Sequence, residues 1–81
     1  MITVKFFAQV RELVGTDELT LDRTFDTAEQ LRQALSDNGP KWALALEKGK
    51  LLVAINQELR ELESPIADGD EVAFFPPVTG G

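Results

Sequence analysis

One stretch of this chain, residues 27–38, has the spacing of a main α-helix, and strand-like runs precede and follow it. Thr27 stands three residues before Gln30, the capping-box arrangement that opens many helices. Apolar residues then recur at helical spacing until Asn38-Gly39-Pro40 ends the pattern. Because the chain has 81 residues, it has room for a single core, which must form between this helix and a sheet.

The remaining patterns predict a mixed sheet and short extra helices. Strands are expected at residues 2–7, 18–22, 51–55 and 71–75, with a weak one at 58–62. A short helix is expected at 8–14, closed by Gly15, and a short apolar turn around Trp42. The segment 51–55 is almost continuously apolar, which predicts burial on both of its faces or close to it. With the last strand beside the first, this order fits an α+β, ubiquitin-like β-grasp fold around one main helix.

The composition excludes several classes of function. Acidic residues outnumber basic ones by 14 to 8 without any Lys/Arg cluster, so neither nucleic acid nor an anionic membrane is an expected partner. There is no Cys or His, which excludes disulfides, thiolate metal sites and imidazole-based catalysis, and the chain is not expected to be an enzyme alone. The sequence has no signal-peptide pattern and no apolar run near 18 residues, so a cytoplasmic location is expected.

The final residues carry the only obvious chemical handle. Gly80 and Gly81 lack Cβ atoms, so they can enter a narrow channel and present an unhindered α-carboxylate to a nucleotide-activating enzyme. Pro76 and Pro77 end the last strand and hold the chain extended, so residues 76–81 can project about 20 Å. Val78 and Thr79 lie between the two prolines and the two glycines, and none of residues 76–81 has a charged side chain. We expect a domain at 1–75 and a flexible tail at 76–81.

The phase of the two end strands predicts a docking surface. If the apolar residues at 2, 4 and 6 face the helix, Phe7 faces away from it. In the last strand, Val72 and Phe74 fit the buried face, which leaves Phe75 outward. Adjacent end strands would bring Phe7 and Phe75 together on the solvent side, at the root of the tail, unless loops or the first helix cover both rings.

Charged residues near these features have competing interpretations. Arg11 lies one helical turn from Phe7, and it could meet a carboxylate of a partner, pair with Glu12 or remain solvated. The acidic residues at 68, 70 and 71 fit a tight turn with surface charge better than a metal site, because a short hairpin points them in diverging directions. No metal site is therefore expected.

Over its whole length the sequence resembles the small, sulfur-carrying subunits of molybdopterin synthase, a family of ubiquitin-like sulfur carriers. The specific segments are FFAQVRELVG at residues 6–15 and DGDEVAFFPPVTGG at residues 68–81, and the turn at 42–46 also fits. The resemblance implies the β-grasp fold and hydrophobic anchors for partners at Phe7, Leu59 and Phe75.

The resemblance also implies a reaction cycle. An adenylyltransferase similar to ubiquitin-activating enzymes would use ATP to adenylate the carboxylate of Gly81, and a persulfide donor would displace AMP and leave a thiocarboxylate. The tail would then give its sulfur to a cyclic pterin precursor in the large catalytic subunit of molybdopterin synthase. The implied assembly is a heterotetramer of two small and two large subunits. No cofactor would be bound to the carrier, and the acid–base residues would belong to the large subunit.

Three other functions remain open from the sequence. The chain could carry sulfur for another product, such as thiazole or a thiolated nucleoside. It could be a ubiquitin-like modifier joined through Gly81 to lysines of target proteins. It could also be an interaction module with an inert tail, in which case removing Gly80 and Gly81 would leave partner function intact.

Overall fold

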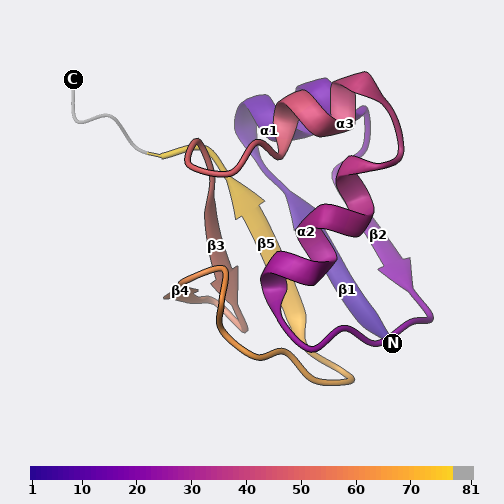
Figure 1. Cartoon of the computed structure of the whole chain (residues 1–81), viewed down its shortest axis with the longest axis vertical. Helices are drawn as coiled ribbons and strands as arrows, with labels where there is room; N and C mark the ends of the chain where they lie inside the picture. The colour runs from indigo at the N-terminus through magenta and orange to yellow at the C-terminus, as the bar shows by residue number, and fades with distance from the viewer. Residues whose placement is uncertain (78–81) are drawn as a thin grey trace.

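A five-stranded mixed sheet with one main helix across one face forms the protein, as Figure 1 shows. The computed structural model describes residues 1–77. The elements are β1 (Ile2–Phe6), α1 (Ala8–Val14), β2 (Glu18–Leu21), α2 (Ala28–Ser36), α3 (Pro40–Ala45), β3 (Leu52–Ile55), β4 (Glu58–Arg60) and β5 (Glu71–Phe75). The sheet order is β2-β1-β5-β3-β4; β1 and β5 are parallel, and the other pairs are antiparallel. The predicted β-grasp arrangement, with the last strand beside the first, is confirmed.

The core lies between α2 and the inner face of the sheet. Alternation along the strands sends every second side chain inward, and those of the central pair β1 and β5 are almost completely buried. The ring of Phe6 stacks with that of Phe74 at a centroid distance of 6.4 Å. The ring of Trp42, in α3, meets Phe6 edge-on at 5.6 Å and 82°. These contacts attach α3 to the end of the sheet where β5 finishes (Figure 1).

The helix ends follow the sequence signals with one exception. The hydroxyl of Thr27 accepts a hydrogen bond from the backbone N–H of Gln30 at 3.2 Å, the predicted cap of α2. Gly15 closes α1 with φ +81°, and its N–H donates to the carbonyl of Arg11. The segment around Trp42 was predicted as a turn, but it is the helix α3. The reason is that Pro40, which ends the preceding pattern, also takes the first position of a new helix.

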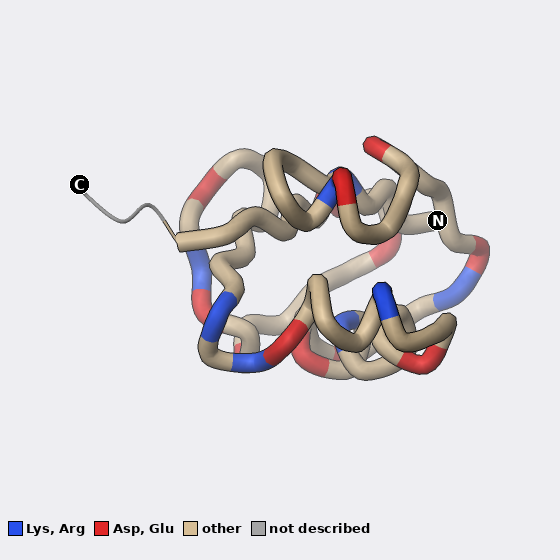
Figure 2. Tube along the Cα trace, turned by 90° about the horizontal axis from the view of Figure 1, so that it is seen from above, with Lys and Arg blue, Asp and Glu red and all other residues tan. Residues whose placement is uncertain are grey.

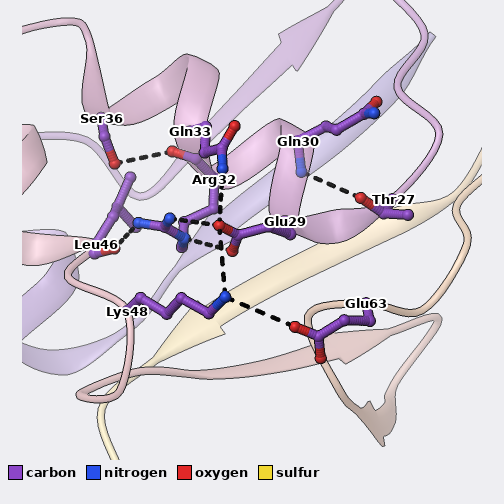
Figure 3. A network of polar contacts seen from close by, with 9 residues as sticks. All are labelled: Thr27, Glu29, Gln30, Arg32, Gln33, Ser36, Leu46, Lys48 and Glu63. Atoms are coloured by element: carbon purple, nitrogen blue, oxygen red, sulfur yellow. Dashed lines mark hydrogen bonds and ion pairs between the residues drawn. The ribbon is translucent and has the colours of Figure 1, made fainter.

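A half-buried ion pair holds α2 against the segment that follows α3 (Figure 3). The guanidinium of Arg32 donates to both carboxylate oxygens of Glu29, at 2.7 and 2.6 Å, and to the carbonyl of Leu46 at 2.9 Å. The amide of Gln33 donates to the same carboxylate, and Lys48 lies 4.0 Å from it. The hydrogen bonds from Arg32 outweigh the effect of partial burial and lower the pKa of Glu29 from 4.5 to about 2.

The loop before β5 is organised by its own carboxylates. Asp70 accepts hydrogen bonds from the backbone N–H of Ala67 at 2.8 Å and from the side-chain amide of Asn56 at 3.0 Å. Asp68 forms an ion pair with the N-terminal ammonium of Met1. Within residues 1–77, no three acidic side chains converge in a group that could hold a metal ion. None of the helices formed by these residues could span a lipid bilayer.

Candidate docking surface and C-terminal tail

A row of large apolar side chains crosses the outer face of the sheet where β5 ends. The parallel register pairs Phe6 with Phe74, and the backbone N–H of Phe7 donates to the carbonyl of Phe74 at 3.2 Å, so Phe7 continues alongside Phe75. On the other side of β5, Phe75 is paired with Leu52 of β3. The three side chains on this row therefore come from three neighbouring segments of the chain, and all point away from α2.

A second row of the same face continues the apolar surface toward β4. Ala73 of β5 is paired with Ala54 of β3, and Ala54 is paired with Leu59 of β4. The two alanines give a low floor, whereas the side chain of Leu59 stands at the edge with 66% of its surface exposed. We call the set Phe7, Leu52, Ala54, Leu59, Ala73 and Phe75 the docking surface. A continuous apolar area of this kind on an open sheet face is typical of a protein-binding site.

The structure places Phe7 and Phe75 where the strand phase put them. Phe7 is 47% exposed and Phe75 is half-buried, so neither α1 nor any described loop covers both rings. The prediction for β3 holds fully only on the inner face, because Leu52 and Ala54 are half-buried on the outer face. The continuous apolar pattern of this strand thus reflects a core on one side and the docking surface on the other. Binding by these residues remains a prediction.

Arg11 lies on the exposed side of α1, close to the docking surface in the chain. Its guanidinium forms no ion pair with Glu12 or with any other residue in the range 1–77, which leaves it available to a partner. It borders a shallow hollow with Gly15, Thr16 and Asp17. The role predicted for Arg11 at an interface is therefore compatible with its position.

The root of the predicted tail adjoins the docking surface. β5 ends at Phe75, and Pro76 and Pro77 follow, the first half-buried and the second exposed. Figure 1 shows this segment leaving the sheet at the end occupied by α1 and α3. Residues 78–81, including Gly81, lie outside the described residues. The division of the chain into a domain at 1–75 and a tail at 76–81 therefore remains a prediction, as do the mobility and the chemistry of the tail.

Charges around the docking surface are mixed in sign. Lys5 and Glu71, next to the apolar rows on the outer face, form an ion pair at 3.2 Å. Figure 2 shows acidic and basic positions interspersed along the described part of the chain. Apolar contact rather than a strong local charge is therefore what this surface offers to a partner.

Comparisons with known proteins identify the family. Residues 4–81 match the model of the ThiS family. The molybdopterin synthase sulfur carrier subunit of Haemophilus influenzae is 64% identical over 81 residues, which cover all of both chains.

Solved structures agree with this assignment. The solution structure of the small archaeal modifier protein 1 of Methanosarcina acetivorans is 30% identical with a TM-score of 0.80, covering 99% of this chain and 95% of that one. A complex of subunits 1 and 2 of the molybdopterin-converting factor of Helicobacter pylori contains a chain that is 26% identical with a TM-score of 0.66, covering 99% and 97%. The chain therefore belongs to the sulfur carrier subunits of molybdopterin synthase, within the ThiS family.

Proposed function

We propose that this chain carries the sulfur used by molybdopterin synthase, as a thiocarboxylate on Gly81. One observation supports the proposal above the others: the apolar docking surface adjoins the point where the chain leaves β5 as Pro76-Pro77. A partner that binds this surface is positioned to receive the residues that follow. The name of the Haemophilus influenzae relative, molybdopterin synthase sulfur carrier subunit, supports this choice of acceptor system.

The proposed chemistry needs no reactive side chain on the carrier. The Gly81 carboxylate attacks the α-phosphate of ATP, which releases pyrophosphate and leaves an acyl-adenylate. The terminal sulfur of a persulfide then attacks the acyl carbon and releases AMP, and a second thiol cleaves the sulfur–sulfur bond to free the thiocarboxylate. ATP is thus used by the activating enzyme, and no cofactor is bound to the carrier. This division of labour fits a chain that lacks Cys and His.

The second half of the cycle takes place in a complex. The large catalytic subunit of molybdopterin synthase binds the docking surface, and Gly81 delivers its sulfur to a cyclic pterin precursor. Phe7, Leu59 and Phe75 act as anchors, with Arg11 at the edge. A dithiolene contains two sulfur atoms and each carrier holds one, so two charged carriers are consumed per product. This stoichiometry suits a heterotetramer of two small and two large subunits. The carrier works in the cytoplasm, where ATP supports its activation.

A relative supports the partner assignment. The Helicobacter pylori structure is a complex of two subunits of molybdopterin-converting factor. Reconstitution tests the proposal: purified large subunit and cyclic pterin precursor are mixed with carrier that has been charged by the activating enzyme, ATP and a sulfur source. The product should form with charged carrier, and should not form with uncharged carrier or with a variant that lacks Gly80 and Gly81. Product formation by that variant would contradict the proposal.

A second function is favoured by a specific similarity. The Methanosarcina acetivorans neighbour is named a modifier protein, and its similarity covers almost the whole of this chain. If this chain also modifies proteins, the activated Gly81 would form isopeptide bonds with lysines, which would appear as adducts of higher mass in cells. A sulfur carrier is instead recovered at the mass of the monomer.

A further inference from the structure

A second apolar feature lies between α1 and α3, and it adjoins the tail root at Pro76. This groove has a volume of about 350 Å³. Its lining comprises Gln9, Val10, Leu13, Leu44, Ala45, Glu47, Lys50 and Pro76. Figure 1 shows α1 and α3 side by side at the end of the sheet where β5 finishes.

The most exposed large apolar side chain of this groove is Leu44. It is 62% exposed, close to the 66% of Leu59 in the docking surface, although other residues of α3 anchor this helix to the core. On α3, Trp42 contacts Phe6 edge-on, and Ala45 is buried. The position of α3 is therefore fixed by other residues, and Leu44 is not needed to hold it. An exposed leucine on a well-anchored helix is more useful for binding than for folding.

The groove also favours one kind of occupant. Its charged borders, Glu47 and Lys50, pair with each other at 3.7 Å, so they offer no net charge to a ligand. The floor is made of apolar side chains from both helices. A short apolar segment of a protein fits this combination, whereas an anionic small molecule does not.

The groove is continuous with the docking surface through the chain itself. Phe7 is the N-cap residue of α1, so the helix that forms one wall begins at the docking surface. Pro76 lines the groove and directly follows Phe75 of the docking surface. A protein that encloses the tail at its root is therefore within reach of both the docking surface and this groove.

We propose that the groove between α1 and α3 binds an apolar segment of the large synthase subunit, beside the opening that admits the tail. This proposal rests on the proposed function, because it takes the large subunit as the protein that encloses the tail. Two separate contacts next to the root fix the direction in which the tail enters the partner. One contact alone would leave the carrier free to rock about the docking surface.

The test measures binding of the full-length carrier to the purified large subunit by titration calorimetry. Leu44→Asp should raise the Kd at least about tenfold, because it places a charge where the partner buries an apolar side chain. Ala43→Asp is the matched control: it puts the same charge one residue away on the same helix, outside the groove, and should change the Kd less than about twofold. Leu44→Gln should also raise the Kd, although it introduces no charge. Circular dichroism establishes that each variant is folded.

Three results would overturn the proposal, and they can be distinguished. If Leu59→Asp weakens binding while Leu44→Asp resembles Ala43→Asp, the groove is not part of the interface, although the proposed function stands. If Leu44→Asp affects only the activating enzyme, or only self-association of the carrier in sedimentation experiments, the assigned occupant is wrong. If wild-type carrier does not bind the large subunit at all, the proposed function fails together with the inference.

Discussion

Replacing Glu29 by glutamine removes the carboxylate to which the guanidinium of Arg32 is bound. The side chains of both residues are largely shielded from water, with 15% and 12% of their surfaces exposed. Glutamine retains the size of the side chain and one acceptor, but it loses the charge that the two hydrogen bonds of 2.6 and 2.7 Å require for their strength. The variant therefore tests the electrostatic part of this contact rather than the packing of α2.

The magnitude follows from the pKa of Glu29. Lowering it from 4.5 to about 2 corresponds to at most about 3 kcal/mol of stabilisation when the group is ionised. Because the pKa is lower in the folded state, this stabilisation is fully present above pH 4.5 and is lost as the pH falls through about 2. The difference in unfolding free energy between wild type and Glu29→Gln should thus be largest at neutral pH and should shrink toward zero near pH 2.

Urea unfolding followed by the fluorescence of the single tryptophan, Trp42, measures this difference at a series of pH values. Glu63→Gln is the matched control: Glu63 is 67% exposed and lies 3.8 Å from Lys48, so its removal should cost less than about 1 kcal/mol. Equal losses for the two variants at pH 7 would refute the reasoning. A deficit of Glu29→Gln that stays constant down to pH 2 would refute it as well.

Two further predictions concern the hairpin of β3 and β4 and the docking surface. Gln57 has φ +69° in the two-residue turn that joins these strands, so Gln57→Gly should stabilise the protein by about 1 kcal/mol, seen as a higher urea midpoint; a lower midpoint would contradict this. Leu59→Asp should raise the Kd for the large subunit at least about tenfold, and it should leave the free energy of unfolding in urea within about 0.5 kcal/mol of wild type because this side chain is exposed. Unchanged affinity would remove Leu59 from the interface.

Much of the fold could be predicted because local signals agree with one another. The period of two in the first and last strands fixes which side chains face α2, and that phase leads directly to Phe7 and Phe75 on the outer face. The Thr27 cap and the Gly15 end of α1 are equally local, since each depends on residues within one turn of a helix. These features could therefore be predicted from the sequence alone.

The features that sequence reasoning missed depend on contacts between distant segments. A run of apolar residues such as 51–55 looks the same whether its second face is covered by a helix or left open for a partner, so Leu52 was not recognised as part of the docking surface. The exposure of Leu44 depends on how α3 packs against α1 and the sheet, and the spacing of apolar residues in the sequence does not predict it. The bond from Arg32 to the carbonyl of Leu46 joins residues 14 positions apart, and it too requires the folded structure.

The central claim is that Gly81 carries sulfur. The most direct measurement is the intact mass of the carrier before and after incubation with its activating enzyme, ATP and a sulfur source, with fragmentation to locate any change. The account predicts a gain equal to one sulfur replacing one oxygen, located at Gly81, and no gain when ATP is omitted. An unchanged mass after an activation reaction that charges a known carrier, or a mass change located elsewhere in the chain, would contradict it.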